Sequence, residues 1–210
     1  MTRVLIADDH EVVRDGVRAF LERHSNYLVV AEAADGEEAI AKAIDTEPDV
    51  ALLDYSLPLL NGLEVTRQIR ARLPRTEVLI FTVCESELVI EETLKADARG
   101  YLLKYDANRY LLDAIASVAA HRPFFTSKVT ETLLKRYLTR PHQPASILTN
   151  RERTVVQMIA EGHSNKQIGR ILNLSIKTVE THRAAVMRKL NFSSPADLVR
   201  YAIRNQIIEA

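Results

Sequence analysis

The stretch VALLDYSLPLLNGL, residues 50–63, carries the most informative signal for the fold of this chain. Its four apolar residues, Val50–Leu53, predict a buried β-strand that ends at Asp54. The proline, asparagine and glycine that follow predict a loop leading into a helix. In an open α/β sheet, ligands bind just beyond the carboxyl ends of the strands, where a carboxylate must be solvated, paired or bound to a cation. We therefore interpret Asp54 as a chemical switch.

The residues around this stretch repeat the same strand-and-helix pattern. Segments with helical spacing of apolar residues separate further short apolar runs, which lie at residues 4–7, 27–31, 78–81 and 101–103. Five strand–helix units in strict alternation predict a parallel sheet with helices on both faces. We expect residues 1–120 to form this five-stranded, doubly wound α/β domain.

Length and composition are those of a globular protein with one large or two ordinary domains. The chain has 210 residues, of which 47% are hydrophobic and 27% charged. No apolar run is long enough to cross a bilayer, and residues 1–3 lead directly into the first predicted strand. We therefore expect a soluble cytoplasmic protein without a signal peptide. The single cysteine, Cys84, excludes an intramolecular disulfide and a cysteine-based zinc site.

The net charge of zero conceals a difference between the two parts of the chain. Residues 1–120 contain 13 Lys and Arg against 22 Asp and Glu, whereas residues 121–210 contain 15 against 6. The first part therefore carries −9 and the second +9, which makes the second part a candidate for binding nucleic acid. The alternative is a chance segregation of charges on two solvated surfaces.

Polar residues follow four of the predicted strands. Asp8 and Asp9 follow the first, Asp54 the third, Thr82 the fourth and Lys104 the fifth. These strand ends share one edge of a parallel sheet, and carboxylates that converge there suit Mg²⁺, which prefers oxygen ligands. A hydroxyl and an ammonium group opposite them suit the oxygens of a phosphoryl group. Each residue alone has an ordinary explanation, as a helix cap, a strand former or a solvent-facing lysine, but their conjunction favours a site.

Residues 121–147 predict a connecting segment. Arg122 and Pro123 end the fifth helix, and the two phenylalanines that follow can pack locally. Thr126 or Ser127 can cap a further helix. The two prolines within residues 141–144 predict a semi-rigid linker.

Residues 148–210 predict four helices and no strand. Thr149 and Glu152 have the spacing of a capping box for the first helix. The next two, residues 165–172 and 176–190, form a helix-turn-helix pattern, whose second helix enters the major groove of DNA. Its outward-facing residues are Lys177, Thr178, Glu180, Thr181, Arg183, Ala184, Arg188 and Lys189. The alternative is a solvated helix face on a small bundle.

A set of motifs in the first part is specific when taken together: DD at 8–9, DxxLPxxNG at 54–62, Thr82, and GYLLK at 100–104. With these motifs, residues 1–120 resemble a two-component receiver domain of flavodoxin-like fold. The resemblance implies that Asp54 accepts a phosphoryl group from a sensor histidine kinase. It also implies that Mg²⁺ is held by Asp9, Asp54 and the backbone carbonyl of Ser56, with Asp8 assisting through water. Thr82 and Lys104 would contact the phosphoryl oxygens. Tyr101 would be the aromatic switch residue, and the alternative for it is an aromatic packed in the core.

The second part carries motifs of its own: LTNRER at 148–153, EGHSNKQI at 161–168, SIKTVETHR at 175–183 and RKL at 188–190. They are similar to the LuxR-type DNA-binding domain, and the whole chain resembles a NarL/FixJ-type response regulator. The resemblance implies that bases face Glu180, Thr181 and Ala184. It implies that phosphates lie near Lys166, Lys177, Thr178, His182 and Lys189, and the expected DNA-binding set also includes Asn165 and Arg188. Leu198, Tyr201 and Ala202 would form a dimer contact or close the core of the domain.

The resemblance therefore implies a DNA-binding transcriptional regulator controlled by phosphorylation, which catalyses only its own phosphorylation and dephosphorylation. Its expected partners are a sensor histidine kinase, double-stranded DNA and, when phosphorylated, a second copy of the chain, with RNA polymerase as a further candidate and no membrane. A dedicated phosphotransferring enzyme would need a substrate pocket and a general base that the sequence does not offer.

Three departures from the receiver pattern leave a third alternative open, a regulator that acts without phosphorylation. Bulky Val83 follows the switch threonine, no proline follows Lys104, and Asp97 stands where glycine is expected at a helix end.

Overall fold

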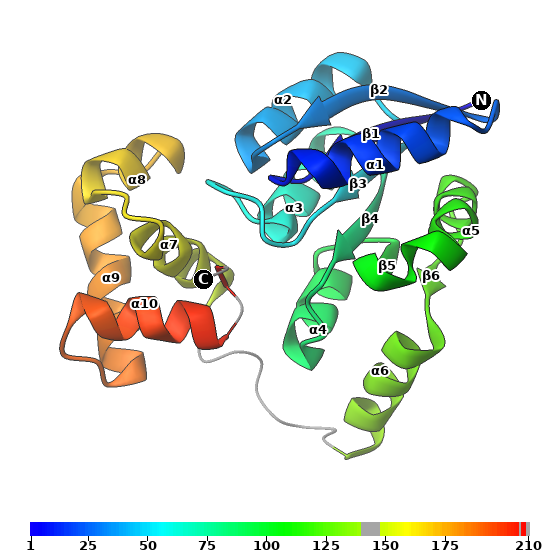
Figure 1. Cartoon of the computed structure of the whole chain (residues 1–210). Coiled ribbons are helices and arrows are strands. Elements are labelled where there is room, and N and C mark those ends of the chain that lie inside the picture. Colours follow the sequence, from blue (N-terminus) through cyan, green and yellow to red (C-terminus); the bar gives the residue numbers. More distant parts are fainter. Residues whose placement is uncertain (140–147, 206, 209–210) are drawn as a thin grey trace. The chain divides into compact units, whose positions relative to one another are not determined.

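The computed structural model describes residues 1–139, 148–205 and 207–208. The chain forms two compact units, Met1–Pro141 and His142–Ala210. The first unit is a sheet flanked by helices and the second is a group of helices (Figure 1). Each unit has a hydrophobic core of its own. The linker predicted at residues 141–144 lies outside the described residues.

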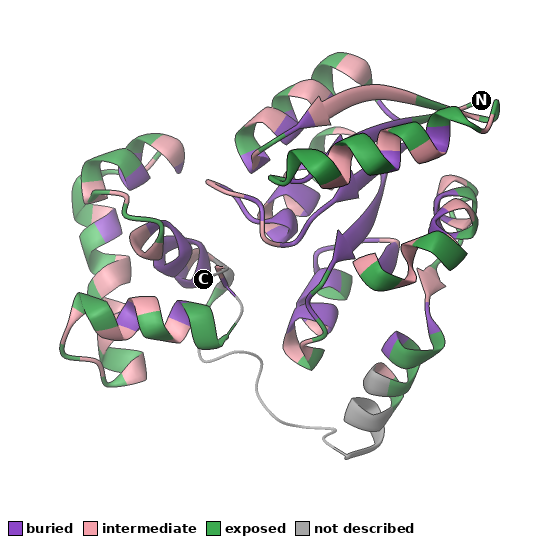
Figure 2. Ribbon diagram, in the orientation of Figure 1, coloured by how far each residue is buried: buried purple, intermediate pink, exposed green. Residues whose placement is uncertain are grey.

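The first unit is built on a six-stranded sheet in the order β2-β1-β3-β4-β5-β6, with every pair parallel. The strands are β1 (Thr2–Ala7), β2 (Tyr27–Ala33), β3 (Val50–Leu53), β4 (Glu77–Thr82), β5 (Gly100–Leu103) and β6 (Phe124–Phe125). Apart from β6, this is the order of flavodoxin-like doubly wound sheets, as expected. Every residue of β3, β4 and β5 is buried (Figure 2), because helices cover the sheet on both faces.

The expectation of five strands is wrong by one, because Phe124–Phe125 pairs with β5 as a sixth strand. A strand of two residues is too short to show the alternation by which strands are recognised in a sequence. The preceding helix returns the chain to the free edge of β5. There the amide of Phe124 donates a hydrogen bond of 3.2 Å to the carbonyl of Arg99. The strand is therefore a product of tertiary pairing.

Helices connect successive strands and cover both faces of the sheet (Figure 1). They are α1 (Glu11–Glu22), α2 (Gly36–Thr46), α3 (Gly62–Arg72), α4 (Glu87–Lys95) and α5 (Ala107–Ala119), with a 3-10 turn, η1 (Lys104–Asp106), before α5. The apolar stripes of α1 and α5 share one core with the strands, in which Val17, Leu21, Leu111 and Ile115 meet Ile6 and Leu52. After β6, the helix α6 (Ser127–Thr139) follows, and it contacts α4.

The second unit consists of α7 (Asn150–Ala160), α8 (Asn165–Ile171), α9 (Ile176–Leu190) and α10 (Pro195–Arg204). Its core is formed by Leu148, Val156, Val186, Leu198, Ala202 and Ile207. The predicted capping box of α7 is present, because Thr149 accepts from the amide of Glu152 while Glu152 accepts from the amide of Thr149. Ser175 caps α9 in the same sense by accepting from the amide of Thr178 at 3.1 Å. The four expected helices are therefore confirmed.

The turn between α8 and α9 depends on a close approach of the backbone at Gly169. A Cβ atom at this position would lie 2.8 Å from the carbonyl oxygen of Leu174. Asn173, in the turn itself, has φ +53°, a left-handed conformation that asparagine tolerates better than most residues. The tight turn between the two helices therefore requires glycine at position 169 and a residue that tolerates a positive φ at position 173. Among the helices of the described residues, none is long and apolar enough to cross a membrane.

Candidate functional site

The carboxyl edge of the sheet brings the expected site residues together. Ala7 of β1 pairs with Leu53 of β3, so the residues that follow them, Asp8 and Asp54, are also neighbours. The amide of Asp54 donates to the carbonyl of Ala7 at 2.8 Å, which holds the two strand ends in register. Convergence at this edge is therefore a consequence of parallel pairing.

Lys104 contacts both acidic residues at the centre of this edge. Its Nζ atom lies 2.7 Å from Oδ2 of Asp54 and 2.7 Å from Oδ2 of Asp8. Both carboxylates are buried, with side chains 1% exposed, and the Lys104 side chain is 14% exposed. Burial raises the pKa of Asp8 more than the hydrogen bond from Lys104 lowers it, so the net change is upward. Burial lowers the pKa of Lys104, but the charges of Asp54 and Asp8 outweigh it and raise this pKa overall.

The cluster can hold a divalent cation. Asp8, Asp9, His10 and Asp54 each offer one ligand atom, and these atoms lie within 4.8 Å of one another. The buried carboxylates of Asp8 and Asp54 share one lysine, and the more exposed carboxylate of Asp9 contacts only His10 among these groups, so the cluster retains negative charge. Carboxylate oxygens are the ligands that Mg²⁺ prefers, and the residues present therefore fit this ion. Ser56 lies two residues beyond Asp54, and its amide donates to Oδ1 of Asp54 at 3.3 Å.

His10 was not among the predicted site residues, but the structure places it in this cluster. Its Nδ1 atom lies 2.7 Å from Oδ1 of Asp9, and its amide donates to Oδ1 of Asp8 at 3.0 Å. The signal in the sequence was its position directly after the acidic pair. An imidazole nitrogen is a poorer ligand for Mg²⁺ than a carboxylate oxygen, so we interpret His10 as a neighbour that orients the acids.

Thr82 and Tyr101 meet at the loop that follows β4. The Thr82 side chain is fully buried, and its Oγ1 atom accepts a hydrogen bond of 3.2 Å from the amide of Cys84. Tyr101 is also fully buried, and its hydroxyl donates to the carbonyl of Cys84 at 2.6 Å. Burial, more than any neighbouring group, raises the pKa of this phenol. The side chain of Val83, next to Thr82, is exposed. One residue of the loop, Cys84, thus connects both expected switch residues.

The loop after Asp54 depends on the glycine of the quoted stretch. A Cβ atom on Gly62 would lie 2.3 Å from the carbonyl oxygen of Asp54, which is an impossible contact. Asn61, the preceding residue, caps α3 by accepting from the amide of Glu64 at 3.0 Å. Gly62 therefore allows the chain to pass close to the end of β3, and Asn61 caps the beginning of α3.

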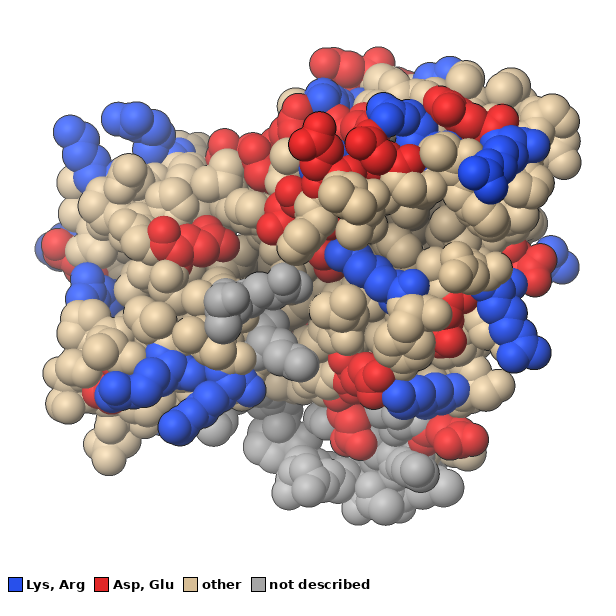
Figure 3. Space-filling view, in the orientation of Figure 1, with Lys and Arg blue, Asp and Glu red and all other residues tan. Residues whose placement is uncertain are grey.

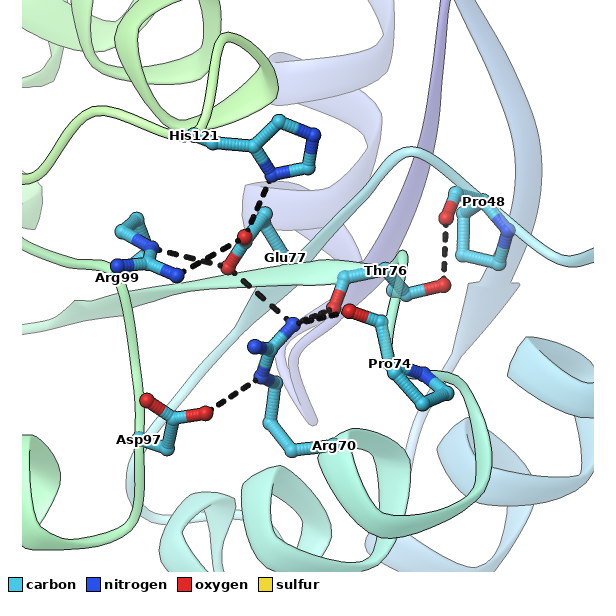
Figure 4. Close-up of polar contacts among 8 residues, drawn as sticks. All are labelled: Pro48, Arg70, Pro74, Thr76, Glu77, Asp97, Arg99 and His121. Carbon is cyan, nitrogen blue, oxygen red and sulfur yellow. Dashed lines mark hydrogen bonds and ion pairs between the residues drawn. The ribbon is translucent and has the colours of Figure 1, made fainter.

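A second polar cluster, which no pattern in the sequence indicated, lies at the amino end of β4 (Figure 4). Glu77 is 2% exposed and contacts Arg70 at 3.3 Å, Arg99 at 3.2 Å and Nδ1 of His121 at 2.7 Å. Burial raises the pKa of Glu77, but Arg99, His121 and Arg70 outweigh it, so its pKa is lowered. Asp97 has φ +66° and accepts from Nε of Arg70 at 2.9 Å. The cluster joins α3, β4 and the ends of α4 and α5 at the edge opposite Asp54.

The expected base-facing residues of α9 lie on its exposed surface. Glu180, Thr181 and Ala184 are exposed, as are Lys177 and Arg188. Thr178 and His182 are half-buried, and on α8 Lys166 is exposed and Asn165 is half-buried. Lys189 differs from the other expected phosphate contacts, because its Nζ atom lies 2.6 Å from Oε2 of Glu152. Lys and Arg side chains gather on the surface of this unit that Figure 3 shows, whereas the first unit presents more Asp and Glu.

The three residues expected at a dimer contact have different environments. Leu198 and Ala202 are fully buried and belong to the core of the second unit. Tyr201 is half-buried, and its ring packs edge-on against Phe192 at 5.7 Å between centroids. Of the three, only Tyr201 has surface to offer a partner.

Comparisons with known proteins agree for both units. Residues 4–116 match the family described as "Response regulator receiver domain", and residues 146–202 match "Bacterial regulatory proteins, luxR family". The chain is 36% identical over 216 residues to the oxygen regulatory protein NreC of Staphylococcus epidermidis and 37% identical over 215 residues to NreC of Staphylococcus aureus. Each alignment covers 99% of both chains.

Solved structures with similar architecture are also response regulators. RcsB from Salmonella enterica serovar Typhimurium, bound to the promoter rprA in the presence of the phosphomimetic BeF3-, has a TM-score of 0.69 and 26% identity. That match covers 95% of this chain and 97% of RcsB. A two-component response regulator of the LuxR family from Aurantimonas sp. has a TM-score of 0.63 and 33% identity, over 66% of this chain and 99% of the other.

Proposed function

The chain belongs to the response regulators that combine a receiver domain with a LuxR-type DNA-binding domain, and from this membership we propose that phosphorylation of Asp54 controls its binding to DNA. The observation that carries the proposal is the position of Lys104, whose ammonium group contacts both Asp54 and Asp8 within a cluster of acids. An ammonium group and a cation site on either side of one carboxylate suit the transfer of a phosphoryl group, which is catalysed mainly by positioning and charge.

In this proposal Asp54 is the phosphoacceptor, and Mg²⁺ is held by Asp54, Asp9 and the backbone carbonyl of Ser56, with Asp8 assisting. The bound ion supplies positive charge that offsets repulsion between the acids and an incoming phosphate. Lys104 exchanges its contact with the Asp54 carboxylate for one with a phosphoryl oxygen. The hydroxyl of Thr82, which accepts from Cys84, turns to donate to another phosphoryl oxygen.

The same change would reach Tyr101, because its hydroxyl and that of Thr82 both bond to Cys84. A shift of Thr82 toward the phosphoryl group breaks the bond to the Cys84 amide and moves the loop. The hydrogen bond of Tyr101 to the Cys84 carbonyl then has to follow or break. Tyr101 is therefore proposed as the residue that transmits the change to the α4–β5 surface.

For the output, we propose that α9 enters the major groove of double-stranded DNA. Its exposed residues Glu180, Thr181 and Ala184 would face bases, and a glutamate can accept from the amino group of cytosine. Residues proposed near phosphates or bordering them are Asn165, Lys166, Lys177, Thr178, His182, Arg188 and Lys189. Contact of Lys189 with a phosphate would require it to leave Glu152, so its contribution to binding should be smaller than that of Lys177.

The proposed organisation is a receiver at residues 1–120, a connecting segment with a helix at 121–147 and a DNA-binding domain at 148–210. A sensor histidine kinase would supply the phosphoryl group in the cytoplasm, and RNA polymerase is a further candidate partner. The phosphorylated chain would form a homodimer, because two copies can occupy paired half-sites. Tyr201 would contribute exposed surface to a contact through α10, with Leu198 and Ala202 supporting that helix from the core.

The test is the mass of the intact protein after incubation with acetyl phosphate and Mg²⁺. Wild type should gain one phosphoryl group, and Asp54→Asn should gain none. The matched control is Asp45→Asn, which makes the same change at an exposed position of α2. A natively folded wild type that gains no mass overturns the proposal. Equal DNA affinity of wild type and Asp54→Asn with the donor present would instead favour a regulator that acts without phosphorylation.

Two substitutions on α9 test the proposed DNA contacts. Lys177→Ala should weaken binding to all sequences about equally and reduce the salt dependence of the affinity. Glu180→Ala should relax the preference at one base pair, with a change of about 1–3 kcal/mol in discrimination. Binding measured by fluorescence anisotropy at several salt concentrations separates these effects. If Lys177→Ala and Glu180→Ala bind every sequence like wild type, α9 does not read the DNA.

A further inference from the structure

The first turn of α6 lies against α4 and the end of β5. The helix follows β6 directly and contacts α4. Val129 in its first turn is 1% exposed, and together with Ile90 of α4 and Leu103 of β5 it lines a cavity of about 20 Å³. A cavity of this size has room for about one water molecule. The contact is therefore close packing and not a ligand site, and Val129 anchors α6 to the receiver.

Next to this anchor, three polar side chains from three different elements meet. Nζ of Lys128 in α6 lies 2.6 Å from Oε2 of Glu85 and donates to the hydroxyl of Tyr105 at 3.1 Å. The Tyr105 hydroxyl in turn donates to Oε1 of Glu85 at 2.6 Å. Lys128 also lies over the Tyr105 ring, 5.4 Å from its centroid. The hydrogen bond from Lys128, followed by that from Tyr105, lowers the pKa of Glu85. We call these three residues the α6 clasp.

The two receiver residues of the α6 clasp follow the two residues proposed to contact the phosphoryl group. Tyr105 comes directly after Lys104, at the position where a proline was missing from the expected pattern. Glu85 comes three residues after Thr82 and directly after Cys84, which bonds to both Thr82 and Tyr101. Any movement of Thr82 and Lys104 toward a phosphoryl group therefore changes the spacing of both partners of Lys128.

The polar contacts of the α6 clasp are weak enough to break and re-form. Glu85, Tyr105 and Lys128 are all exposed, and exposed ion pairs contribute little to stability because water and salt screen them. The buried side chain of Val129 supplies the larger apolar contact but has no directional preference. Small displacements of two polar partners are therefore sufficient to change how often the first turn of α6 detaches.

We propose that the α6 clasp holds the first turn of α6 on the α4–β5 surface while Asp54 is unphosphorylated, and that phosphorylation weakens it and uncovers this surface. The proposal rests on the proposed function, because it names the element that responds to the phosphoryl group. Since α6 is the last helix that the structure describes before residue 148, its release would change the exposed surface of the receiver.

Hydrogen exchange of the amides at residues 130–134, measured on the full chain by mass spectrometry, tests the clasp. In wild type, acetyl phosphate with Mg²⁺ should accelerate this exchange. Lys128→Met should accelerate it without phosphorylation, by about two- to fivefold, which is the effect expected from an exposed ion pair. The matched control is Lys42→Met, which removes a half-buried lysine on α2 with its ion pair to Glu38 and its hydrogen bond to the carbonyl of Glu32, and should leave α6 unchanged.

A charge exchange separates the clasp from a general loss of stability. Glu85→Lys and Lys128→Glu should each accelerate exchange in α6, and the double variant should return it toward the wild-type rate because the pair is restored with opposite polarity. Absence of a mass gain in wild type overturns the proposed function and the clasp with it. A normal mass gain with unchanged exchange in α6 overturns the clasp alone, as does a double variant as fast as the singles.

Discussion

Lys104 and Asp54 are 50 residues apart in the chain, and yet Nζ of the lysine lies 2.7 Å from Oδ2 of the aspartate. The lysine contacts Asp8 at the same distance, so one ammonium group serves two buried carboxylates. The negative charge of the two carboxylates exceeds the positive charge of the one ammonium group. A bound cation or a phosphoryl group would each change this difference. The stability of the unit should therefore respond to changes at this single residue.

Replacement of Lys104 by Met should destabilise the protein in the absence of Mg²⁺ by about 2 kcal/mol, because the two buried carboxylates lose their counter-charge. Urea unfolding at neutral pH measures the change. Addition of Mg²⁺ should recover part of the loss, since the ion replaces the missing positive charge. The control Lys42→Met removes contacts with Glu38 and with the carbonyl of Glu32 and should change the free energy of unfolding by no more than about 1 kcal/mol. A Lys104→Met variant as stable as wild type would contradict the charge balance described above.

Mg²⁺ itself should stabilise the wild-type protein. At ten times its dissociation constant, an ion that binds only the folded state adds about 1.4 kcal/mol to the free energy of unfolding. Asp9→Asn should remove most of this response because it removes one proposed ligand, and Asp45→Asn should retain it. Thermal unfolding with and without the ion, with Ca²⁺ as a second comparison, provides the measurement. A response that is equal in wild type and Asp9→Asn would exclude Asp9 as a ligand.

Glu77→Gln should destabilise the protein by about 2 kcal/mol at pH 7, since Arg70 and Arg99 lose a buried carboxylate. The pKa of Glu77 in the folded protein is lowered from its ordinary value of 4.5. The stability that it contributes is therefore fully present above pH 4.5 and is lost as the pH falls through the folded pKa.

Urea midpoints at a series of pH values should show the difference between Glu77→Gln and wild type shrinking below pH 4.5. The control is Glu22→Gln, an exposed position at the end of α1, where no such trend is expected. A difference between Glu77→Gln and wild type that is independent of pH would mean that packing, not charge, stabilises the Figure 4 cluster.

Asp97 has the left-handed backbone conformation that the sequence predicted to favour glycine. Asp97→Gly removes the conformational strain but also the exposed ion pair with Arg70, so we expect a gain of no more than about 1 kcal/mol. Asp97→Ala loses the ion pair and keeps the strain, and it should destabilise by about 1 kcal/mol. Chemical unfolding of both variants checks the order, and an alanine variant more stable than the glycine variant would contradict it.

Gly169→Ala should destabilise the second unit by about 1–3 kcal/mol, because the added Cβ atom would lie 2.8 Å from the carbonyl oxygen of Leu174 and force the turn to shift. Gly16→Ala is the informative comparison, since a Cβ at that position of α1 has nothing within 4 Å. It should stabilise by about 0.5–1 kcal/mol through helix propensity. Thermal unfolding combined with DNA binding distinguishes a displaced recognition helix from a general effect.

Much of the site could be predicted because it depends on where strands end. Asp8, Asp54, Thr82 and Lys104 each follow a short apolar run, and parallel pairing places all such ends at one edge. The sequence could not show that Lys104 contacts two acids equally, nor that His10 lies on Asp9. Those contacts depend on the directions of side chains around a loop, which the pattern of apolar and polar residues does not predict.

On α9 and α10, residues for which the sequence predicts the same role have different environments in the structure. Helical spacing placed Leu198 and Ala202 on one face, and only the packing of α10 against α7 shows that this face is the core. Lys189 shares the positive charge of Lys177, but Glu152 lies 37 residues away in the chain and 2.6 Å away in space. Charge and spacing in the sequence thus indicate which residues could contact DNA or a second copy. Contacts with residues distant in the chain show which of them are free to do so.

The alternation of strands and helices, the capping box at Thr149 and the strand ends that make up the acidic edge could all be predicted from the amino-acid order alone. Each of these depends on residues within a few positions of one another, where backbone preference and apolar period act directly. The sixth strand, the Glu77 cluster and the α6 clasp could be seen only in the folded protein. In each of these, strands or side chains that are distant in the chain meet, such as Glu77 with Arg99 and Glu85 with Lys128, and the energy comes from charges and edges that come together only after the sheet has formed.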